Sequence, residues 1–244
     1  VMNDSASDPL ALFREVNTMG TLALARQAVK AGVKRFVFLS SIKVNAETTK
    51  ANSPCREKVE QAPTDPYGLS KYEAEQGLLR IAQEKTMEIV IIRSPLVYGP
   101  GVKGNFSSMV KWVKKGAPLP LGAINNRRSF IAIDNLVSFI VHCIACPEAA
   151  NEVFVISDGE DVSTTELLKK VASAYGVKSC LLPVPVKPMG LVLKLLGKGV
   201  LAERLFGNLQ VDCSKACDSL GWKPVITMDE QLKQMAVIAK GAIF

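Results

Sequence analysis

The chain has 244 residues, of which 48% are hydrophobic, and a formal net charge of +7 with a pI of about 9.1. This length is enough for one large domain or two small ones with a real core. The sequence shows neither the roughly 18 apolar residues of a membrane span nor a signal peptide, so we expect no stable membrane anchor and take the cytosol as the default. Nucleic-acid binding would need a basic stripe with aromatic partners, whereas the lysines are spread out and aromatic residues make up only 6%.

Helical and strand patterns alternate along the first two thirds of the chain. Residues 17–31 carry apolar side chains at helical spacing, and Gly32 follows, as is common after a helix. RFVFLSS at 35–41 is a nearly continuous apolar run, typical of a strand buried on both faces of a parallel sheet. The pattern then predicts, in order, a helix over 67–83, a strand over 88–101, a helix over 134–146 and a strand over 152–159. This alternation indicates an α/β protein.

The C-terminal part reads mainly as helices. Ser163 or Thr164 is a predicted N-cap, with Glu166 in the first turn. A final helix is predicted from about residue 229. Residues 191–207 are both apolar and basic, which leaves two interpretations open: a peripheral membrane helix or, the one we favour, a helix of a small second domain.

Cysteine and histidine offer little for metal or redox chemistry. The scatter of the six cysteines fits reduced thiols better than a disulfide framework. Cys143 and Cys146 with His142 resemble half of a metal site, but no second ligand pair is spaced to complete a tetrahedron. We therefore predict no metal. His142 is the only histidine, so a Ser-His-Asp triad has almost nothing to work with.

Tyr67 and Lys71 are the first pair that suggests chemistry. A helix brings positions i and i+4 onto one face, and an ammonium near a phenol is expected to lower its pKa from about 10. A tyrosine with a lowered pKa can move a proton on and off an alcohol. Ser40 and Ser41 end the strand before this helix, at the edge where doubly wound sheets bind ligands, so a serine hydroxyl can bond the same substrate oxygen.

These stretches together carry a family resemblance. The chain resembles the extended short-chain dehydrogenase/reductases, in particular the NAD-dependent epimerase/dehydratase family that acts on nucleotide sugars. The similar stretches are GVKRFVFLSSIKVN, DPYGLSKYEAE, IIRSPLVYGPGVKGNF, RRSFIAIDNL and DCSKACDSLGWKP. They cover nearly the whole chain in the family's order. The most similar members are bacterial 4-epimerases or 4-keto reductases of surface-polysaccharide synthesis.

The resemblance implies a fold and a set of partners. The fold is a Rossmann-like doubly wound parallel sheet with a smaller C-terminal substrate-binding domain. Residues 1–100 and 127–157 would form part of the NAD-binding core, and residues 101–126 and 158–244 the nucleotide-sugar region. The cofactor implied is NAD, with NADP as the alternative, and the substrate is a UDP-sugar. The helices over 17–31 and 67–83 match those that commonly pair across a two-fold axis, which implies a homodimer.

Site residues also follow from the resemblance. Ser41 matches the catalytic serine or threonine, Tyr67 the general acid/base, and Lys71 its partner, which also holds the nicotinamide ribose. Further residues on the cofactor side are Ser40, Ser94, Pro95 and Leu96. On the substrate side, Asn105 and Phe106 match the loop over the nucleotide diphosphate, Arg128 the arginine that clamps it, and Arg204 a looser second phosphate contact.

Two features depart from the family pattern. At Leu96, epimerases commonly have an asparagine that contacts the sugar nucleotide, and leucine cannot make that hydrogen bond. No G-x-x-G-x-x-G appears near the N-terminus, where it would cradle the cofactor pyrophosphate. By resemblance, VMND follows the fourth strand and roughly seventy to eighty residues precede it in the family. We therefore expect a fragment that, as given, does not turn over nucleotide sugars at a measurable rate.

Several activities remain open. A 4,6-dehydratase needs an acid and a base just after the catalytic residue, whereas Ile42 and Lys43 follow Ser41, which argues against dehydration. Epimerase and 4-keto reductase are not separated by the sequence. A non-catalytic fragment that only binds is the alternative from a different class. A reductase of apolar substrates is disfavoured, because RRSFIAIDNL would then have no diphosphate to bind.

Overall fold

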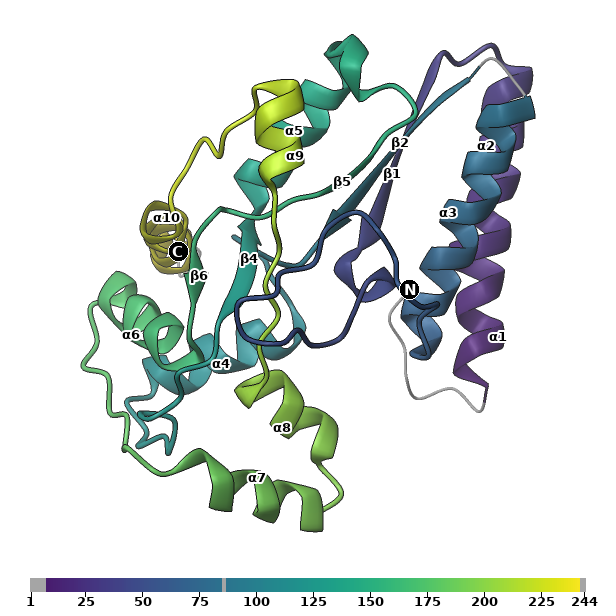
Figure 1. The fold of residues 1–244 in the computed structure, drawn as a ribbon. Coiled ribbons are helices and arrows are strands. Elements are labelled where there is room, and N and C mark those ends of the chain that lie inside the picture. The colour runs from purple at the N-terminus through teal and green to yellow at the C-terminus, as the bar shows by residue number, and fades with distance from the viewer. Residues whose placement is uncertain (1–7, 85–86, 242–244) are drawn as a thin grey trace.

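The computed structural model describes residues 8–84 and 87–241, and it confirms the Rossmann-like α/β class (Figure 1). Three parallel strands form the main sheet in the order β1-β2-β5, with bounds Arg35–Ser41, Glu88–Ser94 and Val153–Val155. Helices α2 (Thr21–Lys30) and α3 (Pro66–Glu84) cover one face of this sheet, while α5 (Ile133–Ala145) and α9 (Ser214–Leu220) cover the other. Such a sheet presents the carboxyl ends of its strands along one edge.

The N-terminal helical region is longer than the sequence suggests. Instead of one helix over 17–31, α1 (Pro9–Phe13), a π-helical stretch (Arg14–Gly20) and α2 (Thr21–Lys30) run on continuously. Gly32, with a φ of +74°, follows the end of α2, as predicted. The motif VMND lies outside the described residues.

The predicted strand over 88–101 is wrong, because Pro95 divides it. Proline has no N–H for a sheet ladder, and the chain changes sheets at this residue. After β2, β3 (Leu96–Tyr98) pairs in parallel with β4 (Arg128–Ala132), which pairs antiparallel with β6 (Asp161–Val162). The strand predicted over 152–159 is likewise shorter, at β5.

The remaining elements agree broadly with the predicted order. Ser163 forms a capping box with Glu166 at the start of α6, which confirms the predicted N-terminus. In chain order, the remaining helical elements are a 3-10 turn (Ile42–Val44), α3 (Pro66–Glu84), α4 (Gly104–Lys114), α5 (Ile133–Ala145), a 3-10 turn (Pro147–Ala149), α6 (Thr164–Tyr175), α7 (Val186–Leu195), α8 (Gly199–Phe206), α9 (Ser214–Leu220) and α10 (Met228–Gly241). No helix within the described ranges combines the length and apolar character that crossing a bilayer requires.

Strand β1 is not buried on both faces, contrary to the sequence interpretation. Leu39 in this strand is 40% exposed. Leu39 is exposed because β1 lies at the edge of the described sheet and pairs with β2 alone. The carboxyl end of β1 is therefore open on the side away from β2.

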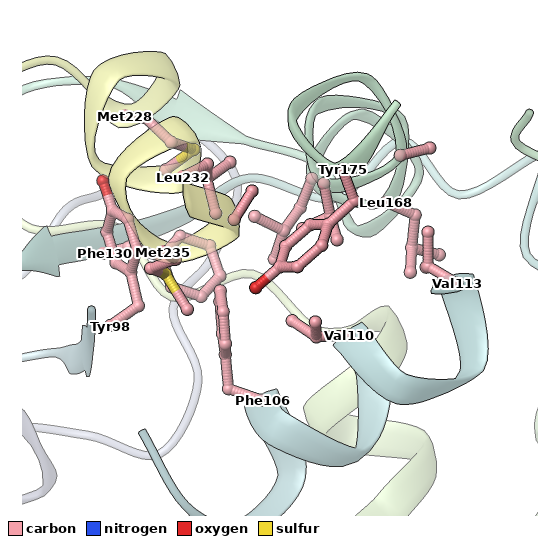
Figure 2. Packing of buried hydrophobic residues seen from close by; sticks show 14 of the residues in the cluster. Tyr98, Phe106, Val110, Val113, Phe130, Leu168, Tyr175, Met228, Leu232 and Met235 are labelled. Carbon is pink, nitrogen blue, oxygen red and sulfur yellow. The ribbon is translucent and has the colours of Figure 1, made fainter. Parts of the chain in front are cut away.

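A second hydrophobic core lies between α4, α6 and α10 (Figure 2). The ring of Phe106 stacks on that of Tyr98 at 5.6 Å, and Phe130 meets Tyr98 edge-on at 6.4 Å between ring centroids. Tyr175 and Met235 also belong to this cluster. The cluster takes residues from both predicted domains, so the proposed boundaries stay a prediction.

A buried ion pair joins the sheet to α3. Arg93 in β2 and Glu75 in α3 are both buried. Arg93 Nη2 lies 2.6 Å from Glu75 Oε2, and Arg93 Nε lies 3.0 Å from Glu75 Oε1. Arg93 Nη1 also donates to Asn45 Oδ1 at 3.1 Å and to the Glu57 carbonyl oxygen at 2.6 Å. The guanidinium thus fixes α3 and the loop after β1 to the same strand.

Breaking this pair is expected to destabilise the fold strongly. In Arg93→Met, the Glu75 carboxylate stays buried without a partner, which should lower the free energy of unfolding by about 3–5 kcal/mol. The double variant Arg93→Met with Glu75→Leu should recover most of this loss, because neither charge remains. Urea unfolding measures the free energy of unfolding of the unchanged chain, the single variant and the double variant.

The matched control is Arg14→Gln, which removes one partner of the exposed ion pair between Arg14 and Glu73. Exposed pairs contribute little, so a much smaller change is expected. An Arg93→Met variant as stable as this control would contradict the structural role of the buried pair.

Candidate active site

The carboxyl ends of β1 and β2 bring four predicted residues together. Ser41 and Ser94 are direct neighbours in the parallel register, and Ser40 lies opposite Arg93. Ser40 Oγ is buried and is the one such side-chain atom in the described residues without a hydrogen-bond partner. Pro95 is also buried. This edge therefore holds an uncompensated hydroxyl, a group that calls for a ligand or a water.

The start of α3 is held tightly against the end of β1. Asp65 Oδ2 accepts a hydrogen bond from the Gly68 N–H at 2.8 Å, and Lys43 Nζ lies 3.1 Å from Asp65 Oδ1. A Cβ atom on Gly68 would lie 2.7 Å from the Lys43 carbonyl oxygen. Only glycine allows this approach, which brings Tyr67 to the strand end.

The side chains of Tyr67 and Ser41 lie close enough to interact. Burial raises the pKa of the Tyr67 phenol, while the interaction with Ser41 and the charge of Lys43 act in the opposite direction. Lys43 Nζ lies 6.0 Å from the Tyr67 ring centroid. The expectation that Lys71 lowers this pKa is thus wrong for the structure, because burial outweighs the nearby charge and Lys43 supplies that charge.

Lys71 points instead to the open edge of β1. Its Nζ donates to the Leu39 carbonyl oxygen at 3.0 Å and lies 4.6 Å from the Phe38 ring centroid. Burial lowers the pKa of Lys71, and Glu75 partly opposes this effect. A lysine ammonium at an open strand edge is placed to donate hydrogen bonds to a ligand that lies along that edge.

These residues fit one end of a dinucleotide. Leu39 and Leu96 are 40% and 41% exposed and offer apolar contacts beside the unpartnered Ser40 hydroxyl. Lys71 can donate to a ribose hydroxyl, and Ser94 and Pro95 form the wall at the end of β2. The residues present therefore suit a nicotinamide and its ribose, whereas the sequence carries no G-x-x-G-x-x-G loop for the pyrophosphate.

A different glycine loop, which the sequence interpretation missed, opens α4. Gly99, Gly101 and Gly104 form G-x-G-x-x-G between β3 and α4, and the last two have φ values of +76° and +70°. Asn105 follows in the first turn and is exposed. A glycine-rich loop that leads into a helix N-terminus favours anions. The spacing of these glycines in the sequence could have indicated this loop.

The expected loop position of Asn105 and Phe106 needs correction, because both belong to α4. Phe106 is 4% exposed and packs on Tyr98 in the second core (Figure 2). Its side chain therefore anchors the helix in this core, and its part in substrate binding stays a prediction. Asn105 remains as the exposed polar side chain of this turn.

Two arginines lie together without a carboxylate partner. Arg128 begins β4 and its Nη1 donates to the Gly207 carbonyl oxygen at 3.1 Å. Burial lowers the pKa of Arg128, and the neighbouring charge of Arg204 in the last turn of α8 adds to this effect. Neither arginine forms an ion pair with an acidic residue in the described ranges. Two adjacent guanidinium groups without counter-charge suit a diphosphate.

The histidine and cysteines are engaged elsewhere. His142 Nε2 lies 2.9 Å from the Leu220 carbonyl oxygen, and Cys143 is buried. All six cysteines are unpaired. Among residues 8–84 and 87–241, no group of three or more potential ligands is arranged to hold a metal ion.

Sequence reasoning also missed the charged residues that support the site. Lys43, Asp65, Glu75 and Arg93 all act through tertiary contacts. One signal was present, since Arg93 interrupts the apolar run EIVIIRS and a charge in a buried strand requires a partner.

Removing Lys43 is expected to raise the pKa of Tyr67 further. In Lys43→Gln, the phenolate loses a cation while the carboxylate of Asp65, which also raises this pKa, remains. Lys71→Gln should have a smaller effect. A pH titration by NMR with ¹³Cζ-labelled tyrosine resolves Tyr67 among the four tyrosines. If Lys71→Gln raised the pKa of Tyr67 as much as Lys43→Gln or more, Lys71 would be the partner of Tyr67, as the sequence suggested.

Comparisons with known proteins identify the family of this chain. The family model described as NAD dependent epimerase/dehydratase family matches residues 2–157. A UDP-glucose 4-epimerase of Vibrio cholerae is 52% identical over 97% of this chain and 72% of its own length. A UDP-glucose 4-epimerase structure from Thermotoga maritima, solved with UDP-glucose, is similar with a TM-score of 0.77 at 24% identity, covering 100% of this chain and 77% of that one. An Agrobacterium tumefaciens short-chain dehydrogenase/reductase structure with bound NAD gives 0.76 at 24% identity, covering 100% of this chain and 78% of that one. The chain therefore belongs to the NAD-dependent epimerase/dehydratase family.

Proposed function

We propose that this chain carries the catalytic and substrate-binding parts of a UDP-sugar 4-epimerase that uses NAD. The observation that carries the proposal is the placement of Tyr67 beside Ser41 at the open carboxyl edge of the sheet, with Lys71 on the same edge. The 52% identity to the Vibrio cholerae UDP-glucose 4-epimerase supports the choice of reaction and substrate.

In this proposal, Tyr67 moves the proton of the sugar 4-hydroxyl. Ser41 holds the same oxygen by a hydrogen bond, so that the oxygen lies between two hydroxyls. Because burial raises the pKa of Tyr67, the phenol is well suited to return the proton, and the charge of Lys43 favours its uptake. When bound, NAD supplies the hydride acceptor and donor for the sugar carbon. Acid–base catalysis of this kind contributes about 10²–10⁴-fold to the rate.

The remaining residues would hold the ends of the substrate and the cofactor. Arg128 and Arg204 would bind the UDP diphosphate, with the N-terminus of α4 and Asn105 as further donors. Ser40, Ser94, Pro95 and Leu96 would contact the nicotinamide end of NAD, and Lys71 its ribose. NADP stays the alternative cofactor.

A 4-keto-sugar reductase is the second candidate. Leu96 is exposed beside the site and offers no hydrogen bond to the sugar nucleotide, where an epimerase of this family commonly has an asparagine. Such a reductase would use the same Tyr67 and Ser41 to protonate the sugar oxygen. It would differ in needing a reduced cofactor for each turnover.

The homodimer also stays a prediction. Val16, Met19 and Leu24 project from the helical run that ends in α2 and are 42%, 58% and 57% exposed, which supports a contact through this face. A role in surface-polysaccharide synthesis is proposed from the sequence resemblance alone. The cytosol is proposed as the location by default.

Tyr67→Phe should lower turnover by about 10²-fold or more, because the phenol hydroxyl carries the proton. The assay follows conversion of UDP-glucose to UDP-galactose by a chain extended upstream with a family-like glycine-loop segment. UDP affinity should stay nearly unchanged. Tyr72→Phe, which removes a second hydroxyl from the same helix, is the control and should retain activity. Full turnover in Tyr67→Phe would remove the acid–base assignment.

Arg128→Ala should weaken UDP binding by about 1.5–3 kcal/mol, the range for a charged hydrogen bond. Arg128→Lys should recover only part of this, because lysine lacks the two-pronged guanidinium. Calorimetry with UDP and the 244-residue chain measures the effect without requiring turnover. The exposed neighbour provides the control, and Arg127→Ala should bind UDP like the unchanged chain. Equal affinity in all variants would exclude Arg128 from the diphosphate site.

A further inference from the structure

Helices α7 and α8 form a hairpin at the margin of the molecule, away from α5 and α9 (Figure 1). Helix α7 contributes no buried residue, and α8 contributes only Ala202. The two helices pack mainly on each other. The hairpin therefore presents most of its surface outward.

The outward surface of this hairpin is apolar. Leu191, Leu195, Leu196 and Val200 are 61%, 78%, 64% and 61% exposed. At 100° per residue, Leu191 and Leu195 fall on one face of α7, so the exposed leucines form a stripe. Isolated exposed leucines are ordinary, but a contiguous apolar patch marks an interaction surface.

An apolar groove lies beside α7. Its volume is about 430 Å³, and apolar residues alone line it. They include Pro120, Leu121, Met189, Leu193, Leu205 and Phe206. The apolar stripe on α7 is thus continued by a hollow that could take part of a hydrocarbon chain.

The charge around this surface is mainly positive, because Glu203 is the one acidic residue of α7 and α8. Between Glu166 and Glu203 the chain carries six lysines and no acidic residue. Lys187 and Lys194 belong to α7, and Lys198 lies in the turn before α8. None of these three forms an ion pair within the described part of the chain. An apolar face flanked by lysines is the pattern of helices that lie in a membrane interface.

We propose that the α7–α8 hairpin docks on an anionic lipid bilayer. The stripe of Leu191 and Leu195 enters the boundary between headgroups and acyl chains, and Lys187, Lys194 and Lys198 contact the anionic headgroups. Lysine suits this position, because its stem stays apolar while its ammonium reaches the headgroups. The contact is peripheral, since neither helix is long enough to span a bilayer.

The same charges disfavour a second copy of the chain as the occupant. A two-fold contact places the same patch on both sides. Lysines of one copy would then face lysines of the other, and Glu203 is the one carboxylate of α7 and α8 that could offset them. An anionic membrane surface supplies the missing negative charge.

Vesicle flotation with the 244-residue chain tests the proposal. The probes are phosphatidylcholine vesicles with and without phosphatidylglycerol, at low and high salt. Binding should require phosphatidylglycerol and weaken at high salt. Lys194→Gln should lower the partition constant about fivefold, the effect of one lysine near such a surface. Leu195→Glu should lower it at least about tenfold, because a carboxylate replaces a leucine that would insert between the acyl chains.

Ile144→Glu on α5 is the matched control, because Ile144 is 61% exposed and lies outside the hairpin. It should bind vesicles like the unchanged chain, and circular dichroism should show all variants folded. No binding to phosphatidylglycerol vesicles at low salt, or an equal loss in Ile144→Glu, would overturn the proposal. So would a dimer in light scattering that Leu195→Glu dissociates while vesicle binding is absent.

Discussion

Arg93 enters the protein interior near the carboxyl end of the apolar strand β2, where an unpaired charge would be very costly. Its guanidinium is compensated by Glu75 from α3 and by two oxygens of the loop that follows β1. Replacing such a pair by apolar residues is often neutral for stability. We therefore infer that the pair serves to position the site. It fixes α3 and the loop after β1 to strand β2; Tyr67 lies at the start of α3, and Ser41 ends β1 just before that loop.

The electrostatic character of the site changes from one end to the other. Around Tyr67 and Lys71, burial disfavours both charged forms, raising one pKa and lowering the other. Such a setting suits a proton that must move in both directions. Around Arg128 and Arg204, two like charges lie together without a counter-ion in the described residues. That setting suits a permanent anion, so the geometry separates the chemistry from the binding of the nucleotide.

The sequence predicted what depends on local pattern. Each of three features depends on only a few neighbouring residues: the apolar run at β1, the helix start at Ser163 and the spacing of Tyr67 and Lys71. The structure contains the strand and both helices. The sequence could not predict the break at Pro95, since a strand that changes sheets keeps the same apolar pattern. It also placed Asn105 and Phe106 in a loop, although both belong to α4 and the ring of Phe106 packs in the second core. The contacts of Lys43 and Asp65 with the site arise only when the 3-10 turn after β1 packs against the start of α3. These contacts are not visible in any local sequence pattern.

The central claim is that this site exchanges the configuration at a sugar carbon. Deuterium at C4 of UDP-glucose tests it most directly, with NAD and a chain extended upstream by a glycine-loop segment. The account predicts UDP-galactose that retains deuterium at C4, without any supply of reduced cofactor. Loss of the label from the product, or product that forms only when reduced cofactor is added, would contradict the epimerase assignment and support the reductase.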